Sequence, residues 1–139
     1  MAIIGTIEIE LATPRYLTSL KRLTQNPLQR ICLGVQDLER GGEPVEEFAV
    51  NEEIIRRIFN ETIGAAWNQH TLAQKGVPLP ANCFPYPVFR VNYSPSLTNI
   101  ATGVFQAMDP VVANLKDRLV YVVAQSADLK STFFRSKNR

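Results

Sequence analysis

Four stretches of the chain have the residue pattern of a β-strand. Residues 6–11 alternate strictly between apolar and polar side chains, with isoleucine and leucine on one face and glutamate on the other. Such alternation is typical of a strand that buries one face. Residues 28–38 alternate in the same way, and residues 88–93 and 118–124 are rich in the valine and aromatic side chains that strands favour. The sequence therefore predicts four strands.

Two other stretches have apolar residues at the three- and four-residue spacing of an amphipathic helix. The first, residues 13–26, starts with Thr13-Pro14, a capping residue followed by proline at the first helical position, and ends before Pro27. The second, residues 51–75, has Asn51 as a capping residue, glutamates in its first turn and a glycine just after its end. We expect a helix in both.

The second half of the chain leaves one alternative open. Residues 99–108 satisfy both the strand period and the helix period, so they predict either element. Asp109-Pro110 repeats the capping signal and predicts a helix to about residue 117. Ser126 predicts the cap of a short C-terminal helix, and residues 133–139 form a basic tail that we expect to fray.

The order of these elements predicts an α+β fold. Residues 77–87 hold four prolines and are expected to form an extended connector, and Gly41-Gly42 favours a turn. The strands alternate instead of being apolar throughout, which indicates a two-layer sheet with helices packed mainly on one face. No repeat or linker divides the chain, so residues 1–139 are expected to form a single α+β domain.

The composition is that of an ordinary globular domain, with 139 residues of which 45% are apolar and 20% are charged. The start has neither the basic nor the continuous apolar region of a signal peptide, and every apolar stretch is shorter than the ~18 residues that cross a membrane. Cys32 and Cys83 are too few for a disulfide framework and are expected to be reduced. These features predict a cytoplasmic protein without a membrane partner.

The sequence contains no catalytic or cofactor-binding motif. Gly41-Gly42 lacks the lysine and hydroxyl residue of a phosphate loop and the third glycine of a dinucleotide fingerprint. Glu46-Glu47 and Glu52-Glu53 do not have the spacing of metal ligands. The hypothesis of an enzyme centred on His70, the single histidine, has no carboxylate or cysteine at helical spacing to support it. We therefore predict a protein that is not an enzyme, with no metal and no cofactor.

Charge segregates along the chain, although the net charge is only +2. Residues 13–30 and 116–139 each carry a net charge of +4, and residues 37–61 carry −5. Opposite charges on neighbouring chains would fix their register, and aromatic side chains are enriched at interfaces. The leading hypothesis is a non-catalytic structural or assembly subunit that acts through protein–protein contacts, as a homo-oligomer, in a particle or in a multi-subunit complex. Its candidate interface residues are Arg15, Lys21, Arg22, Arg30, Phe84, Tyr86, Phe133 and Phe134.

The alternative hypothesis is a small nucleic-acid-binding module that uses the two basic segments, residues 13–30 and 116–139. Lysine and arginine attract phosphates, and such binding weakens steeply with salt. The acidic segment, residues 37–61, would repel the same ligand. The candidate residues for this function are Arg15, Lys21, Arg22, Lys130, Arg135, Lys137 and Arg139.

Overall fold

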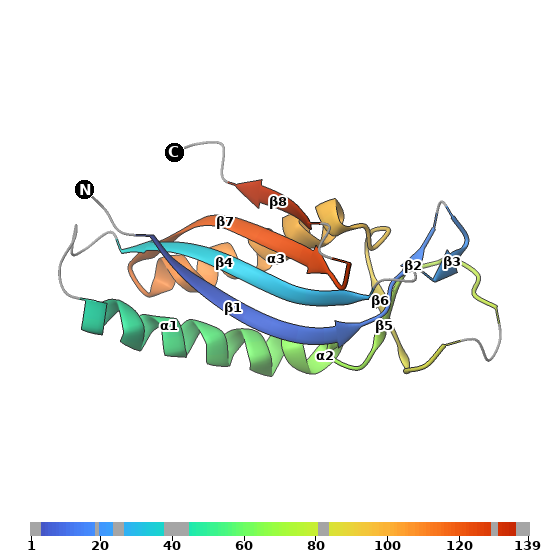
Figure 1. The fold of residues 1–139 in the computed structure, drawn as a ribbon, viewed down its shortest axis with the longest axis horizontal. Helices are drawn as coiled ribbons and strands as arrows, with labels where there is room; N and C mark the ends of the chain where they lie inside the picture. The colour runs from blue at the N-terminus through green and yellow to red at the C-terminus, as the bar shows by residue number, and fades with distance from the viewer. Residues whose placement is uncertain are drawn as a thin grey trace.

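An antiparallel sheet of four strands, in the order β1, β4, β7 and β8, lies at the centre of the protein (Figure 1). These strands are β1 (Ile4–Thr13), β4 (Leu28–Asp37), β7 (Asp117–Ser126) and β8 (Ser131–Arg135). The computed structural model describes residues 4–18, 20–23, 27–37, 45–80, 84–128 and 131–135, and of residues 37, 45–50, 131, 133 and 135 it describes the backbone alone. An antiparallel sheet can bury one face and leave the other in water.

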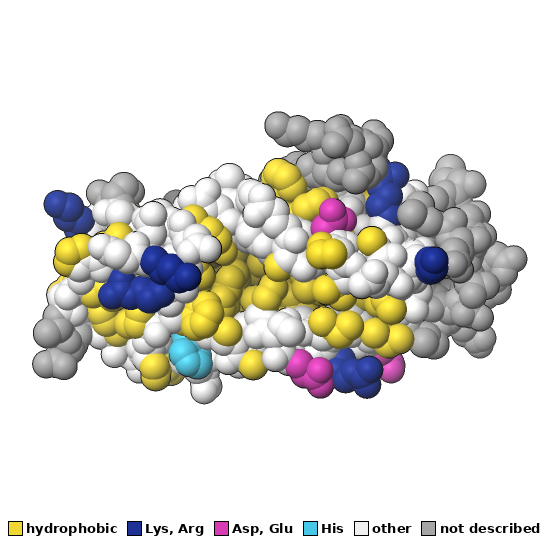
Figure 2. All heavy atoms as spheres, turned by 180° about the vertical axis from the view of Figure 1, so that it is seen from behind, with side chains coloured by type: hydrophobic (Ala, Val, Ile, Leu, Met, Phe, Trp, Pro, Cys, Tyr) yellow, Lys and Arg dark blue, Asp and Glu magenta, His cyan; other side chains and the backbone are white. Residues whose placement is uncertain are grey.

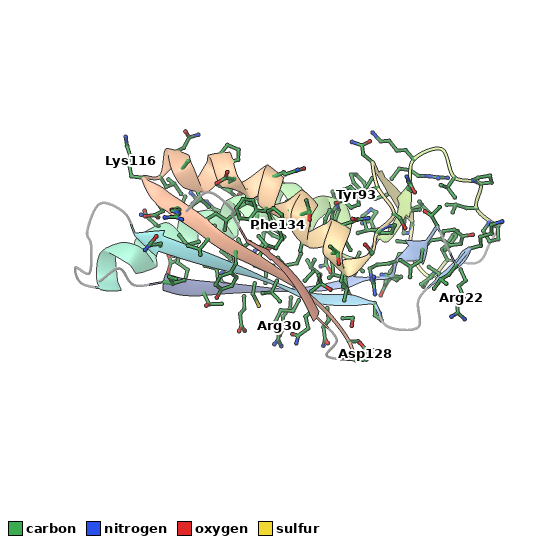
Figure 3. The ribbon with its side chains drawn as sticks, turned by 90° about the horizontal axis from the view of Figure 1, so that it is seen from above. Arg22, Arg30, Tyr93, Lys116, Asp128 and Phe134 are labelled. Atoms are coloured by element: carbon green, nitrogen blue, oxygen red, sulfur yellow. The ribbon has the colours of Figure 1, made fainter. Side chains whose placement is uncertain are left out.

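Helices cover one face of this sheet. Helix α1 (Val45–Phe59) continues through a π-helical segment, η1 (Asn60–Gly64), into α2 (Ala65–Trp67), and helix α3 (Leu97–Asn114) packs against β7 and β8. Figure 3 shows both helical segments on the same side of the sheet. The predicted α+β fold, a sheet with helices mainly on one face, is confirmed. Within the described residues, no helix is long and apolar enough to span a membrane.

The core lies between the sheet and the helices. Alternate residues of β1 and β4 point into it, and their register pairs Ile7 with Leu33 and Ile9 with Ile31. Helices α1 and α3 contribute Ile55, Phe59, Ile100, Val104 and Met108 to the same core. Burial of apolar surface contributes about 25 cal/mol per Å², so the alternation seen in the sequence is the main determinant of this layer.

Two pairs of short strands extend the protein at one end of the sheet (Figure 1). Strands β2 (Tyr16–Leu17) and β3 (Arg22–Leu23) form an antiparallel pair, and β5 (Thr71–Gln74) and β6 (Val88–Val91) form a parallel pair. The predicted strand over residues 88–93 is therefore present as β6.

The predicted proline-rich connector, residues 77–87, joins β5 to β6. In the parts that the structure describes, residues 77–80 and 84–87, it contains neither helix nor strand. Strand β5 is joined to the end of β1, because Leu72 N–H donates to Pro14 O at 2.9 Å. The extension is thus attached to the main sheet through backbone hydrogen bonds.

The predicted helix over residues 13–26 is wrong. Strands β2 and β3 occupy this segment and meet at a tight turn, in which Leu17 O accepts a hydrogen bond from Lys21 N–H at 2.8 Å and Lys21 has a left-handed φ of 54°. Tertiary contacts override the local helix signal, because Tyr16 is buried and Arg15 forms a bridge to β5.

The predicted helix over residues 51–75 has different ends. It starts before Asn51, which is not a cap but lies inside α1, where its Nδ2 donates to Asp117 Oδ2 at 2.9 Å. It ends at Trp67, and Gln69 shortly after it has a left-handed φ of 57°. The last part of the predicted helix is strand β5.

Residues 99–108, for which strand and helix were both open, are helical. The cap of α3 is Ser96, whose Oγ accepts a hydrogen bond from Asn99 N–H at 3.2 Å. The predicted helix start at Asp109-Pro110 is wrong, since Pro110 lies inside α3. Burial of the apolar face of α3 outweighs the cost of a proline that removes one backbone donor.

The predicted C-terminal helix is also wrong. Strand β7 continues to Ser126, and β8 pairs with it. Phe134 of β8 packs against Phe105 of α3 with ring centroids 4.9 Å apart and planes at 73°, so the strand buries an aromatic ring that a frayed tail would expose. Residues 136–139 of the predicted tail and the Gly41-Gly42 turn lie outside the described residues.

One tyrosine crosses the face of the sheet opposite the helices. Tyr121 of β7 lies beside Gly34 of β4, and its Oη is 2.9 Å from Oγ1 of Thr6 in β1. A Cβ atom at residue 34 would lie 2.2 Å from the Tyr121 ring. Glycine is therefore required here by the close approach of an aromatic ring.

Substitution Gly34→Ala should destabilise the fold, because its methyl group would occupy the space of the Tyr121 ring. We expect a loss of about 1–3 kcal/mol in the free energy of unfolding, measured by urea denaturation. In a Tyr121→Ala background the same substitution should cost much less, since the ring is gone. An equal loss in both backgrounds would contradict the proposed steric role of Tyr121.

Candidate partner-binding groove

A groove of about 570 Å³ lies on the helical side, between α3, the η1–α2 segment and β6. Its described lining residues are Ile63, Trp67, Lys75, Phe89, Arg90, Val91, Asn92, Tyr93, Gly103, Gln106 and Ala107. Figure 2 looks onto this side and shows apolar side chains across the middle of the face, with lysine and arginine side chains near one end. The volume lies within the range of about 300–1,000 Å³ that is typical of binding sites.

The groove has a buried apolar base and an exposed apolar margin. Trp67, the single tryptophan, is 6% exposed and Val91 is 8% exposed, so both belong to the core as well as to the groove. Phe89 and Val88 of β6 are 37% and 36% exposed. Of these two residues Phe89 lines the groove, so it places an exposed apolar side chain at the groove margin.

Tyr93 forms part of the groove wall through a close contact with α3. A Cβ atom at Gly103 would lie 2.5 Å from the Tyr93 hydroxyl oxygen, so only glycine leaves room for the phenol there. A glycine inside a helix costs about 0.5–1 kcal/mol relative to alanine. Burial raises the pKa of Tyr93 to about 12, so the phenol is neutral at physiological pH.

The charged residues of the groove are cationic. Arg90 Nη1 donates to Gln74 O at 2.9 Å and to Val77 O at 2.8 Å, which holds the guanidinium group at the end of β5. The side chain of Lys75 is exposed. Among the described residues that line the groove there is no aspartate or glutamate, so its local charge is positive.

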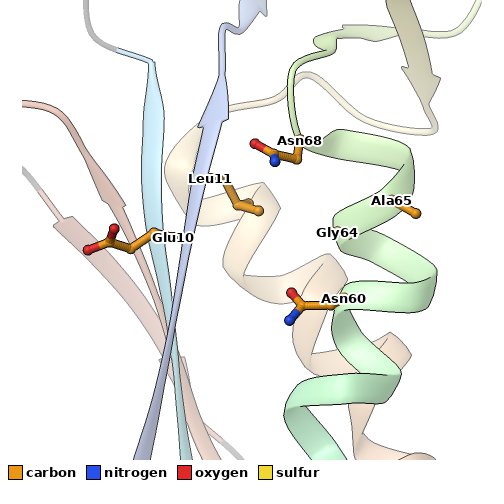
Figure 4. A pocket seen from close by; sticks show the side chains of 6 residues that line it. All are labelled: Glu10, Leu11, Asn60, Gly64, Ala65 and Asn68. Carbon is orange, nitrogen blue, oxygen red and sulfur yellow. The ribbon is translucent and has the colours of Figure 1, made fainter.

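A second, more polar pocket of about 300 Å³ lies between β1 and the η1–α2 segment (Figure 4). In it, Asn60 and Asn68 point toward β1 and Glu10 points away from the helix. Asn68 Oδ1 accepts a hydrogen bond from Ala12 N–H at 2.9 Å, and Gln69 N–H donates to Ala12 O at 2.9 Å. At this pocket, residues just after α2 form hydrogen bonds with backbone groups on the outer edge of β1.

Arg15, a predicted interface and nucleic-acid residue, is 6% exposed. Its Nη1 donates to Pro95 O at 3.0 Å, so it fixes the segment between β6 and α3. Burial lowers the pKa of Arg15, and the charge of Asp128 partly opposes this effect. In the described structure Arg15 is a buried contact and does not offer its charge to a phosphate or a partner.

The other basic residues of segment 13–30 do not form one surface. Arg22 lies in the β2–β3 extension and Arg30 lies on the main sheet, well separated in Figure 3. Arg30 Nη2 is 3.4 Å from Glu10 Oε2, so its charge is partly neutralised. Lys21 and Arg22 are exposed and remain available.

The predicted aromatic residues lie in different places. Phe84 packs edge-on against the buried ring of Tyr16, with centroids 6.0 Å apart, and Phe134 packs against α3. Tyr86 is half-buried, and its carbonyl accepts a hydrogen bond from Thr71 Oγ1 at 3.3 Å. The rings of Phe84 and Phe134 therefore pack against other rings of the same chain.

Several of the predicted site residues lie wholly or partly outside the described atoms. The side chains of Phe133 and Arg135 lie outside the described atoms, and so do Lys130, Lys137 and Arg139 as whole residues.

Two of the residues with acid–base chemistry bond to groups of their own segments. His70 Nδ1 is 3.0 Å from Asn68 O, and Glu52 pairs with Arg56 at 3.4 Å along α1. No group of three or more histidine, cysteine, aspartate or glutamate residues that could hold a metal occurs among the described residues. Cys32 is a free cysteine, and burial, with the charge of Glu8, raises its pKa, so the thiol stays protonated.

Sequence reasoning missed the groove because its residues come from segments that are distant along the chain. Trp67 appeared only as part of a helical apolar face, and Phe89 only as part of a strand pattern. The one signal present in the sequence was the pair Val88-Phe89 after a proline-rich segment, where a short strand at an edge has apolar residues on both faces.

The comparisons with known proteins support the fold alone. The chain matches no protein-family model, and no curated protein matches it. Among solved structures, it is similar to the uncharacterized protein WS1659 from Wolinella succinogenes, with 10% sequence identity and a TM-score of 0.71 over 99% of each chain. The arrangement of elements described above therefore also occurs in a protein of very different sequence.

The buried phenol of Tyr93 should make the free energy of unfolding depend on pH in the alkaline range. The folded-state pKa of about 12 lies above the ordinary value of 10.0, so between these values the folded state binds more protons than the unfolded state. Stability is fully present below pH 10 and should fall as the pH rises toward 12. We expect the free energy of unfolding, measured by urea denaturation, to fall less between about pH 9 and about pH 11 in Tyr93→Phe than in the wild type. An equal loss would contradict the burial of the phenol.

Proposed function

We propose that the protein is a non-catalytic assembly subunit that binds a partner protein through the groove between α3, the η1–α2 segment and β6. The observation that carries this proposal is the exposed apolar side chain of Phe89 at the margin of a groove whose base is apolar and whose charge is positive. An exposed apolar patch with a polar margin is a feature of protein interaction sites.

Two further observations support a binding function over a catalytic one. The groove is lined by aromatic and aliphatic side chains together with two cations, and the acid–base residues named above lie elsewhere or are paired. Aromatic anchors such as Phe89 and Trp67 are the residue types that contribute most to protein interfaces. The groove is also open to solvent instead of enclosed, which suits a polypeptide segment more than a buried small molecule.

The nucleic-acid alternative is less well supported than the groove. Arg15 is buried and Arg30 is paired with Glu10, so the described part of the first basic segment offers phosphates mainly Lys21 and Arg22. Binding to phosphates would need several unpaired cations on one surface.

Site-specific photo-crosslinking in the source cell tests the proposal. A photoreactive amino acid at position 89 should give a discrete adduct with one partner, because Phe89 lies at the groove margin and is 37% exposed. The matched control is position 8, since Glu8 is exposed on β1, where alternate residues point away from the helical layer. No adduct from position 89, or the same adducts from both positions, would overturn the proposal.

Light scattering of the purified protein at low and high salt shows whether the partner is a second copy of the chain or a different protein. A discrete multimer would indicate that the partner is a second copy of the chain, and a monomer that still gives the position 89 adduct would indicate a different protein. Salt dependence would show that charged residues contribute to the contact.

A further inference from the structure

The hydrogen bonds between β5 and β6 determine which backbone groups of β6 are used. Thr71 N–H donates to Pro87 O at 2.8 Å, and Lys75 N–H donates to Val91 O at 2.8 Å. Alternate residues of a strand direct their backbone groups to opposite sides. Pro87, Phe89 and Val91 therefore face β5, and the N–H and C=O groups of the two residues between them face outward.

These outward groups belong to Val88 and Arg90. Among the strands that the structure describes, β6 pairs with β5 alone, so its second side is an edge of this pair. Within the described chain, no residue bonds to the outward backbone groups of Val88 or Arg90. An edge strand with unpaired donors and acceptors is a template for one more strand.

The groove lies beside the same strand. Phe89 and Val91 share one face of β6 and line the groove together with Gln106 and Ala107 of α3. A strand added at the outer edge would place alternate side chains on the face that Phe89 occupies. Those side chains would then meet the apolar groove, while the backbone hydrogen bonds of the added strand would be made to Val88 and Arg90.

Charge indicates the chemistry of the added segment. Lys75 and Arg90 line the groove and no described lining residue is acidic. Pairing of β6 with the β6 of a second copy would add further cations and no acidic lining residue to this surface, so it would lack charge complementarity. Aspartate or glutamate in the added strand would be attracted instead.

We propose that the outer edge of β6 docks an extended segment of a partner protein, in which apolar side chains alternate with acidic ones. This inference rests on the proposed function, because it specifies how the groove would hold its partner. Main-chain hydrogen bonds would supply register, and the groove would select the apolar side chains.

A pair of substitutions at Val88 separates backbone pairing from side-chain contact. Val88→Pro removes the outward N–H group, and this group takes no part in the pairing with β5. The matched control, Val88→Thr, keeps the N–H group and changes the side chain alone. Thermal denaturation and fluorescence of Trp67 would verify that both variants fold.

The probe is a phage-displayed library of random peptides of about twelve residues, selected on the wild-type protein and then measured as synthetic peptides by fluorescence anisotropy. We expect enrichment of sequences in which apolar and acidic residues alternate. Their affinity should fall about tenfold in Val88→Pro and stay nearly unchanged in Val88→Thr, because a backbone hydrogen bond is lost in the first alone. Lys75→Glu should also weaken binding, and added salt should reduce the difference.

Other outcomes overturn the inference in distinguishable ways. Enriched peptides that bind Val88→Pro as well as the wild type but lose affinity in Phe89→Ser would keep the groove as a binding site and exclude edge pairing. Enrichment without acidic residues would exclude the stated partner chemistry. A wild-type dimer that Val88→Pro dissociates would make a second copy the occupant. Failure to enrich any peptide would overturn the inference, and the position 89 crosslink would decide the proposed function separately.

Discussion

The need to satisfy backbone groups at strand edges determines much of this structure. In the order β1, β4, β7 and β8, the outer side of β1 is an edge of the main sheet. The α1–η1–α2 segment and the residues after it cover part of this edge: Arg56 Nη1 donates to Glu8 O, and Asn68 and Gln69 bond to both backbone groups of Ala12. These bonds give the backbone groups of two β1 residues partners within the chain.

This coverage of β1 also creates the groove. It places the η1–α2 segment, and with it Trp67, beside the extension formed by β5 and β6. Thr13 Oγ1 donates to Trp67 O at 2.9 Å, so the end of the helix is fixed to the end of β1. The same constraint is not met at β6, whose outward backbone groups have no partner in the described chain. The edge of β1 is partly closed by the fold, and we infer that the edge of β6 is closed by a partner.

The periodicity of the sequence predicted β1, β4 and β7 of the main sheet and β6 of the extension, but not β2, β3, β5 or β8. The strands with strict alternation and the buried face of α1 were identified because burial depends on spacing alone. The helix prediction for residues 13–26 was wrong because their three-residue apolar spacing is compatible with a helix. The pairing that decides their structure involves β5, which is far away in sequence. The predicted helix start at Asp109-Pro110 was wrong because a proline is common in the first turn of a helix, whereas Pro110 lies inside α3.

The candidate site was harder to predict than the fold for the same reason. Sequence reasoning selected charged and aromatic residues by type, and the structure has Arg15 buried and Phe134 partly buried against the core. The groove depends instead on Tyr93 meeting Gly103 and on Phe89 lying at an edge, which are properties of the assembled structure. An unpaired strand edge leaves no mark in a single sequence beyond a short strand with apolar residues on both faces.

Backbone amide hydrogen exchange of β6, followed by nuclear magnetic resonance, tests the open edge most directly. The N–H groups of Phe89 and Val91 face β5 and should exchange slowly, whereas those of Val88 and Arg90 face outward and should exchange fast in the free protein. Slow exchange at Val88 and Arg90 in the free protein would contradict the account, because it would show that this edge already has a partner within the chain.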